Sequence, residues 1–253
     1  MTPRISVITC CWNSEPFIEQ CIASVRAQRG VDIEHVFVDG GSTDGTLERI
    51  QTLAAAAGGS VRWVTDVRGG ISNAMNVGAG LATGDWIAHL HGDDYYLGTD
   101  AVAKAVAAMQ AQRARWAYGR IASDLDGKLV SDTWAMPAWS PARLLRGNFI
   151  GHPSVFIERT LFEASGGFDT GLKYAMDYDL WLRMARIAAP VYLGYEVAAF
   201  RRHAGSLSTA QADKAFEEDH AVRRRHIGAN PLSRLFHELV YRRRLKRRAA
   251  VGA

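Results

Sequence analysis

An acidic residue and a glycine-rich turn follow a short apolar run near the start of the chain. Residues 37–46, FVDGGSTDGT, place Asp39 directly after the predicted strand 33–38. An acid at a strand end can accept hydrogen bonds from a base N–H or from ribose hydroxyls, and the glycines allow close backbone approach. The alternative is a plain strand-to-helix turn in which Asp44 caps the helix. The segment is neither a G-x-G-x-x-G fingerprint nor a P-loop, so both interpretations stay open.

Two adjacent carboxylates end another apolar run. Residues 85–94, DWIAHLHGDD, put Asp93 and Asp94 at the same predicted sheet edge as Asp39. Neighbouring carboxylates repel each other, and a divalent cation relieves this repulsion. Mg²⁺ and Mn²⁺ prefer oxygen ligands and commonly join one or two carboxylates to substrate phosphates. A polar turn is the alternative for an isolated Asp-Asp pair, and the shared sheet edge is what favours a metal site.

Two acids and two histidines in the second half are further candidates for chemistry. Asp177 and Asp179 precede an apolar helical run in AMDYDLWLR, where one of them could act as a general base. Alternatively, both acids cap the helix and stabilise its dipole. His203 in FRRHAGS and His152 in GHPS stand in predicted loops. A lone histidine is usually structural, so both need support from their surroundings.

Alternating apolar runs and amphipathic segments must position these residues. In the first half they predict a β-α-β-α order, which favours an α/β fold with a mainly parallel sheet and helices on both faces. The second half is less regular. The predicted strands are 4–10, 33–38, 61–65, 85–91, 116–121, 154–157 and 191–200. The predicted helices are 15–28, one introduced by Thr43 and Asp44, 71–82, 100–112, 141–146, 159–165 and 177–188.

The composition is that of a globular protein of 253 residues, with 48 % hydrophobic and 22 % charged residues. The first residues lack the apolar core of a signal peptide, and no apolar run reaches the roughly 18 residues of a membrane span. The three cysteines, Cys10, Cys11 and Cys21, lack metal-type spacing. Their odd number argues against a disulfide framework, so we expect a protein of the reducing cytoplasm.

The net charge of +4 conceals an asymmetry along the chain. Residues 223–253 carry ten Lys and Arg and one acid, Glu238, for a net +9, whereas residues 1–222 carry a net −5. The pI of about 9.1 therefore belongs to the tail, and we expect no nucleic-acid partner. The predicted organisation is one domain over residues 1–222 followed by a basic amphipathic helical tail over residues 223–253.

Five motifs in one order make the sequence resemble the inverting glycosyltransferase family 2, which has the Rossmann-like GT-A fold. The motifs are ISVITCCWNSEPFIEQCIASVRAQ, VDGGSTDGT, GGISNAMNVGAGLATGDWIAHLHGDD, GGFDTGLKYAMDYDLWLRMA and FRRHAGSLS, and they cover roughly residues 4–210. The likeness is greatest to the branch that builds bacterial surface polysaccharides and glycolipids. It implies a nucleotide-binding half over about residues 1–98 and an acceptor-binding half over about residues 99–222.

The resemblance implies a nucleotide-sugar donor, such as a UDP-, GDP- or dTDP-sugar. Thr9 and Asp39 match the family positions that hold the base and ribose. The full set implied for the donor is Thr9, Asn13, Asp39, Asp66, Arg68, Gly70, Asn76 and Asp93. Ser72 and Asn73 stand where the branch often has Tyr-Asp, so the identity of the donor sugar does not carry over.

A divalent metal, Mn²⁺ or Mg²⁺, is implied as well. Asp93 matches the last acid of the family's D-x-D metal motif, with Asp94 beside it, and His203 matches a family histidine that can approach the metal or the diphosphate. The first acid of the motif is His91 in this chain. Metal binding would then rest on Asp93 together with phosphate oxygens and water.

The family's Glu-Asp acceptor motif reads Met176–Asp177 here, so Asp177 is the predicted catalytic base. His152 and Asp179 are predicted beside it on the acceptor side. Asp177 would take a proton from the hydroxyl of a sugar or lipid-linked acceptor as that oxygen attacks the anomeric carbon with inversion. A degenerate, non-catalytic nucleotide-sugar-binding module is one alternative, favoured by the two lost acids. A sugar-nucleotide nucleotidyltransferase is another, although TCCWNS at residues 9–14 lacks its Gly-rich phosphate loop.

The tail has the pattern of an amphipathic helix that begins at Asn230 and Pro231. Its apolar stripe is Leu232, Leu235, Phe236, Leu239 and Val240, and a basic cluster over residues 242–248 follows. Such a helix suits an anionic membrane surface, which would hold the protein peripherally at the cytoplasmic face of the membrane. Alternatively, the stripe packs on the domain or on a second subunit, and the oligomeric state is not predicted.

Overall fold

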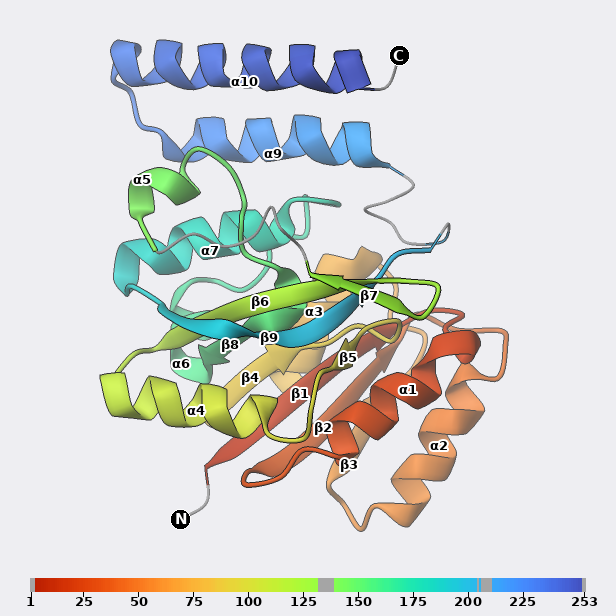
Figure 1. The fold of residues 1–253 in the computed structure, drawn as a ribbon. Coiled ribbons are helices and arrows are strands. Elements are labelled where there is room, and N and C mark those ends of the chain that lie inside the picture. Colours follow the sequence, from red (N-terminus) through yellow and green to blue (C-terminus); the bar gives the residue numbers. More distant parts are fainter. Residues whose placement is uncertain (1–2, 132–138, 204, 206–210, 252–253) are drawn as a thin grey trace.

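The computed structural model describes residues 3–131, 139–203, 205 and 211–251 of the chain, with side chains up to residue 247 (Figure 1). Its centre is a nine-stranded sheet in the order β3-β2-β1-β4-β8-β6-β9-β5, and β7 pairs with β6. Helices cover both faces of this sheet (Figure 1). The arrangement confirms the predicted α/β class.

The first half of the chain builds the parallel part of the sheet. Its elements are β1 (Arg4–Cys11), α1 (Glu15–Arg26), β2 (Asp32–Asp39), α2 (Thr46–Ala56), β3 (Val61–Val64), α3 (Gly70–Leu81) and β4 (Trp86–His89). β1 pairs in parallel with β2 and β4, and β2 with β3. The register joins Cys11 to Asp39, so the carboxyl ends of the two strands meet at one edge. This confirms the predicted β-α-β-α order.

The second half adds strands in both directions. They are β5 (Tyr95–Tyr96), β6 (Trp116–Leu125), β7 (Lys128–Ser131), β8 (Val155–Glu158) and β9 (Val191–Arg201). β8 is antiparallel to both β4 and β6, whereas β6 and β9 are parallel. The sheet is therefore mixed, where the sequence predicted a mainly parallel one. Hydrophobic periodicity identifies a strand but not the direction in which it enters the sheet.

Two apolar layers hold the helices against the sheet. The other helices of the domain are α4 (Ala101–Gln112), α5 (Pro141–Leu144), the 3₁₀ turn η1 (His152–Ser154), α6 (Arg159–Ala164) and α7 (Met176–Ile187). One layer contains α3 and α7, and in it Trp116 of β6 stacks on Trp181 of α7 with ring centroids 6.0 Å apart. The other layer packs α1 and α4 on the opposite face. Burial of the Trp116 and Trp181 side chains holds α7 against the sheet.

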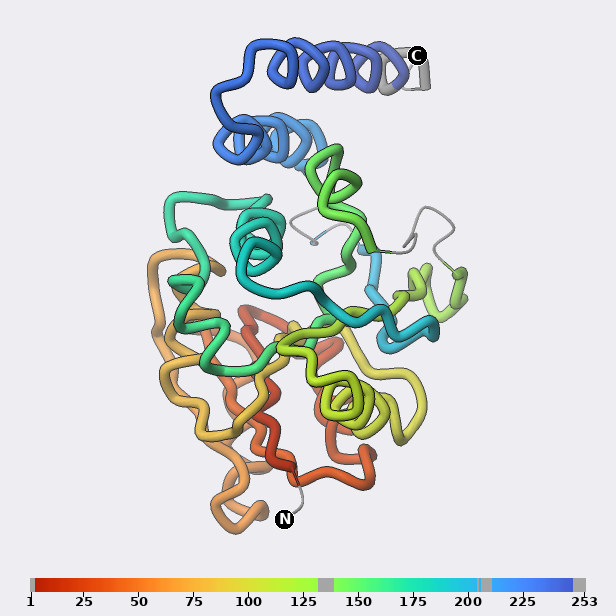
Figure 2. Tube along the Cα trace, turned by 90° about the vertical axis from the view of Figure 1, so that its left-hand side faces the viewer, coloured from red at the N-terminus to blue at the C-terminus, as the bar shows by residue number. Residues whose placement is uncertain are grey.

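Two further helices extend the molecule beyond α7. α9 (Ala212–His226) packs on α7, and α10 (Pro231–Val251) is the outermost element in both views (Figures 1 and 2). The sequence prediction contained no helix over α9, and the domain boundary it placed after residue 222 lies inside this helix. Asn230 Oδ1 accepts hydrogen bonds from the N–H groups of Leu232 and Ser233, which caps α10 as the Asn-Pro pair predicts. Among the helices that the structure describes, none has the length and apolar character needed to cross a bilayer.

Candidate active site

Asp39 organises the loop at the carboxyl end of β2. Its buried carboxylate accepts hydrogen bonds from the N–H groups of Gly41 and Ser42 and from the Thr65 hydroxyl, the last at 2.7 Å. These donors come from two loops, so Asp39 joins the turn after β2 to the turn after β3. The carboxylate thereby shapes the edge at which the sequence predicted nucleotide binding.

The turn after β1 lies against this loop. Asn13 has a left-handed backbone with φ of 49°, a conformation that asparagine tolerates better than most residues. Its N–H donates to the Ser42 hydroxyl, and its Oδ1 accepts from the N–H of Thr43, both at 2.9 Å. The predicted donor residue Asn13 therefore holds two loops together. Trp12 beside it is 66 % exposed, and the Cβ and ring of Trp12 lie next to Gly40.

The prediction from sequence missed Trp12, although an aromatic residue directly after a buried strand was the signal for it. An exposed indole at the sheet edge offers a flat apolar surface on which a planar base can stack.

A third loop brings a cation to the same edge. Arg68 forms an ion pair with Asp66, and both side chains are about two-thirds exposed. A Cβ on Gly41 would come within 2.6 Å of the Arg68 guanidinium, and Gly41 has a φ of +83°, a backbone conformation that favours glycine. Asn73 Nδ2 donates to the Arg68 carbonyl at 2.7 Å, and the positive φ of Gly69 and Gly70 lets α3 begin here. The exposed guanidinium is free of the core and suits a phosphate ligand.

Two predicted donor residues contact the protein interior instead. Thr9 is fully buried, and its hydroxyl lies 2.9 Å from His35 Nε2. Because Thr9 is fully buried, a direct contact of this hydroxyl with a nucleotide would require the residues that cover it to move. Asn76 makes a reciprocal pair of hydrogen bonds with the backbone of Phe168, each at 2.8 Å. Asn76 therefore fastens α3 to the loop that precedes α7.

Asp93 and His203 are far apart in the sequence but lie in contact in the structure, as the predicted metal site requires. Asp93 Oδ2 lies 3.0 Å from His203 Nε2, and each side chain is 26 % exposed. The neighbouring Asp94 is 1 % exposed, and its Oδ1 accepts from the N–H of Arg201 at 3.0 Å. Burial, together with the charge of Asp93, raises the pKa of Asp94 well above its usual range. Coordination by Asp94 would require its side chain to turn out of the interior.

Three histidines lie close to one another in the structure. His91 and His152 stack with ring centroids 4.9 Å apart, and His89 lies 5.9 Å from His152. Burial lowers the pKa of all three imidazoles, that of His89 to about 3. They are therefore neutral near pH 7. His91 replaces the first acid of the metal motif with an aromatic ring that packs on His152, the histidine predicted at the acceptor side.

Asp177 lies in the first turn of α7, where the helix dipole stabilises an acid. Burial nevertheless raises the pKa of its carboxyl to about 7, and the charge of Asp219 adds to this effect. The N–H of Tyr178 donates to Asp177 Oδ1 at 2.6 Å, and Asn148 Nδ2 donates to Oδ2 at 3.4 Å. A carboxyl with such a pKa can accept a proton near neutral pH, as a general base must.

Asp179 has a different environment one half-turn later. It is 5 % exposed and bonded to Arg183 Nε at 2.7 Å and to His226 Nε2 at 2.9 Å. Although burial opposes ionisation, the hydrogen bonds from His226 and Arg183 outweigh it and lower the pKa of Asp179. These partners occupy both oxygens, so Asp179 ties α7 to α9 rather than reaching an acceptor.

Helix α9 contributes acids that the prediction from sequence missed. Glu218 accepts hydrogen bonds from the N–H groups of Lys173, Tyr174 and Ala175, the last at 2.7 Å. It therefore fixes the loop from which α7 begins. Asp219 lies near the fully buried Arg223, at 3.4 Å, and burial raises the pKa of Asp219 to about 6. No motif marked these residues, because their role depends on α9 folding back over α7.

Residues 6–156 match the family described as Glycosyl transferase family 2. An uncharacterized glycosyltransferase of Mycobacterium tuberculosis is 32% identical over 195 residues, which is 75% of this chain and 71% of that protein. A PGL/p-HBAD biosynthesis glycosyltransferase of Mycobacterium bovis is 31% identical over 217 residues, which is 85% of this chain and 82% of that protein.

Solved structures share the fold. Mannosyltransferase PcManGT from Pyrobaculum calidifontis, in complex with GDP-Man and Mn²⁺, matches with a TM-score of 0.71 at 20% identity, over 100% of this chain and 77% of that one. S. aureus TarS 1–349, in complex with UDP-GlcNAc, matches with a TM-score of 0.73 at 18% identity, over 94% of this chain and 70% of that one. The architecture is therefore the GT-A fold that the resemblance implied.

Proposed function

This chain belongs to glycosyl transferase family 2, and we propose that it transfers a sugar from a nucleoside diphosphate to an acceptor hydroxyl with inversion at the anomeric carbon. The observation that carries this proposal is the carboxyl of Asp177, whose pKa burial raises to about 7. A general base is most efficient when its pKa lies near the working pH. Met176, at the position of the family's glutamate, is buried in the core, which leaves Asp177 as the acid of this motif.

The donor half of the proposal rests on the loops after β1, β2 and β3. Trp12 would stack on the base, Arg68 would meet the phosphates, and Asp39 holds the loops that carry them. The same loops contain Asp66, Asn13 and Gly70, which would contribute to donor binding by holding the loops in place. The complexes of PcManGT with GDP-Man and of TarS with UDP-GlcNAc support a nucleotide-sugar donor.

A divalent metal fits the pair formed by Asp93 and His203. Among the described residues, no group of three or more His, Cys, Asp or Glu side chains could hold a metal ion. Two protein ligands suffice where substrate phosphates and water complete the coordination, as is usual for Mg²⁺. Bound there, Mn²⁺ or Mg²⁺ would act as a Lewis acid that stabilises the negative charge of the diphosphate leaving group.

The reaction itself is a single displacement. Asp177 accepts the proton of the acceptor hydroxyl, whose oxygen forms the new bond to the anomeric carbon. The bond from that carbon to the diphosphate breaks on the opposite face, and its electron pair leaves with the diphosphate. Asn148 donates to the second oxygen of Asp177, so it holds the carboxylate in one orientation for the proton transfer.

The names of two relatives support a proposal for the acceptor class. A relative named for PGL/p-HBAD biosynthesis and another named chondroitin synthase, 28% identical over 73% of this chain but only 19% of that protein, support a role in glycolipid or polysaccharide synthesis. We propose a sugar or a lipid-linked sugar as acceptor, used at the cytoplasmic face of a membrane.

Donor binding can be tested with a panel of UDP-, GDP- and dTDP-sugars. We expect one member to raise the melting temperature in the presence of Mn²⁺ or Mg²⁺, because a ligand that binds the folded state stabilises it.

NMR of the product of transfer with that donor should show the opposite anomeric configuration. The Trp12→Ala variant should lose most of the stabilisation by the free nucleotide. A panel without any metal-dependent shift, or a product that retains configuration, contradicts the proposal.

The pH dependence of turnover follows from the raised pKa of Asp177. The base works only when it is deprotonated, so kcat/KM should be half-maximal near pH 7, level off about one pH unit higher and fall tenfold per pH unit well below pH 7. Initial rates measured from pH 5 to pH 9 at constant ionic strength would show this limb. A kcat/KM that stays constant down to pH 5, as expected for a carboxyl with the ordinary pKa of about 4, would mean that burial does not tune this base.

A further inference from the structure

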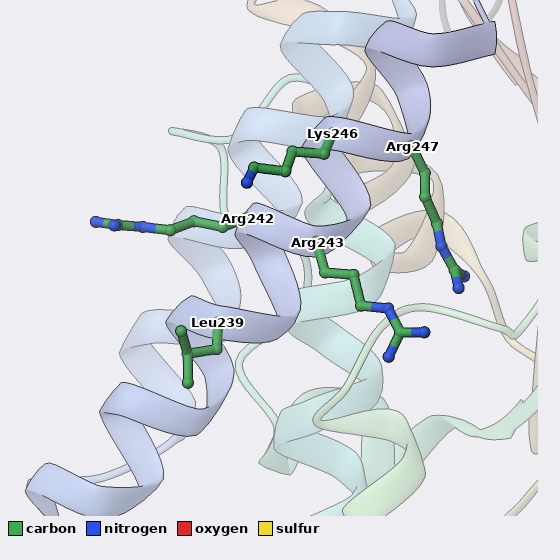
Figure 3. A pocket seen from close by; sticks show the side chains of 5 residues that line it. All are labelled: Leu239, Arg242, Arg243, Lys246 and Arg247. Atoms are coloured by element: carbon green, nitrogen blue, oxygen red, sulfur yellow. The ribbon is translucent and has the colours of Figure 1, made fainter.

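The exposed side of α10 carries an apolar and a basic segment in one line. The residues recur at intervals of three and four, which places them on one side of the helix. This outer face consists of Leu232, Leu235, Phe236 and Leu239, followed by Arg242, Arg243, Lys246 and Arg247, all of them exposed. Figure 3 shows the side chains of Leu239, Arg242, Arg243, Lys246 and Arg247 projecting from this helix.

The opposite side of α10 is packed on α9. His237 is 6 % exposed, and Tyr241 stacks on His220 with ring centroids 3.8 Å apart. Phe216 also stacks on Tyr241 with ring centroids 5.3 Å apart, and Glu238 pairs with His220 at 3.4 Å. These contacts anchor the helix on the side opposite the outer face. From the outer face itself, the Phe236 ring lies 5.5 Å from the Arg146 guanidinium carbon of the domain.

The charge on the outer face has one sign. Glu238 is the only acid from residue 220 onward, and its carboxylate pairs with His220 and with Arg242. The basic half therefore presents four cations, while the apolar half presents three leucines and a phenylalanine. Leu232 and Leu239 are 77 % and 58 % exposed. A surface that offers negative charge together with an apolar interior would satisfy both halves.

We propose that the outer face of α10 docks on an anionic lipid bilayer. The apolar half enters the boundary between headgroups and acyl chains, and the basic half lies among anionic headgroups. A second copy of this chain fits less well, because two such faces would bring eight cations together. A nucleic acid would leave the apolar half without a partner, because its surface is dominated by phosphates.

Docking in this way gives the enzyme a defined orientation. α7, α9 and α10 follow one another outward from the sheet (Figure 1), and Glu218 of α9 fixes the loop that leads to Asp177. A bilayer that holds α10 would thus lie on the side of the molecule that carries the acceptor half. This step rests on the proposed function: it favours an acceptor that is itself attached to a lipid.

Vesicle binding tests the surface without any sugar or nucleotide, so its outcome is separate from that of the transfer reaction. The full chain would be sedimented with vesicles of phosphatidylcholine alone and with 30 % phosphatidylglycerol, a lipid ratio of roughly one anionic headgroup in three chosen to give a negative surface potential. We expect binding to the anionic vesicles that weakens at high salt, because screening reduces the attraction.

Two matched pairs of variants localise the binding. Leu239→Glu should reduce binding at least about tenfold, since it places a charge where an exposed apolar side chain would enter the bilayer. Leu245→Glu is its control, an exposed leucine of the same helix that lies outside the outer face. Lys246→Glu should also reduce binding at least about tenfold, since each basic residue near the surface contributes about fivefold. Arg224→Glu, on the exposed surface of α9, changes the charge equally and should retain binding.

Several outcomes would overturn the proposal. Absence of vesicle binding, equal binding to neutral vesicles, or equal losses in Leu245→Glu and Leu239→Glu would each do so. A dimer in sedimentation velocity that Leu239→Glu disrupts would assign the face to a second copy instead. Unchanged circular dichroism and unchanged transfer to a soluble acceptor in Leu239→Glu would show that its loss of binding is not a loss of folding.

Discussion

Replacing Asp177 with Asn is expected to lower kcat by about 100- to 10,000-fold, the usual contribution of a general base. The amide preserves the shape of the side chain and can still accept a hydrogen bond from the N–H of Tyr178. It cannot take up the acceptor proton efficiently. The proposed donor contacts lie at the loops after β1, β2 and β3, so the dissociation constant for the nucleotide sugar should stay unchanged. Single-turnover rates and calorimetric titration of the donor would measure the two effects separately.

Asp179→Asn is the matched control, because it makes the same chemical change two residues away. Asp179 accepts from Arg183 and His226 and joins α7 to α9. Its replacement should lower the melting temperature and leave kcat near the wild-type value at temperatures where the protein is folded. If Asp179→Asn lost the activity and Asp177→Asn kept it, the base would be assigned to the wrong carboxylate.

Replacing Asp93 with Ala is expected to abolish detectable transfer and to remove the metal-dependent part of nucleotide binding. Asp93 and His203 are the two side chains that the structure brings together at this place, and loss of one leaves too few protein ligands to hold a divalent ion with the diphosphate. The fold should survive, because the Asp93 side chain is 26 % exposed. Melting temperatures with UDP or GDP, with and without Mn²⁺, would show whether the metal-dependent shift disappears.

Asp94→Asn provides the corresponding control for the neighbouring acid. Its carboxyl is buried, and its raised pKa favours the protonated, neutral form, which the amide resembles in charge and shape. The amide oxygen can still accept from the N–H of Arg201. We therefore expect the metal-dependent shift to remain in this variant. Loss of the shift in Asp94→Asn together with its retention in Asp93→Ala would reverse the assignment.

The first half of the fold and the edge of the site could be predicted from the sequence because their signals are local. A short apolar run followed by an acid and two glycines, as in FVDGGSTDGT, specifies a buried strand and a tight turn within ten residues. The parallel register of β1 and β2 then brings Cys11 beside Asp39. Asp93, His203 and Asp177 are likewise candidates that the sequence offers because each stands in a short, recognisable string.

The tertiary structure alone distinguished residues that look alike in the sequence. Asp177 and Asp179 stand two positions apart, yet His226 of α9 bonds only to Asp179, while burial raises the pKa of Asp177. Asp93 and Asp94 are adjacent, yet one meets His203 and the other turns inward to Arg201. Thr9 matched a nucleotide-binding position, but its hydroxyl contacts His35 within the core.

The sequence by itself thus determined the strands other than β5 and β7, which were not predicted, and the acids that end them. It could do so because hydrophobic periodicity and turn chemistry act over a few neighbouring residues. Tertiary structure decided the direction of β8 and the packing of α9 over α7. It also decided the hydrogen bonds by which Glu218 holds the loop before α7. These features depend on burial and on partners more than 40 positions away, as Glu218 is from Ala175. Desolvation and hydrogen bonding set the pKa of a carboxyl, and both arise only when such distant segments pack together.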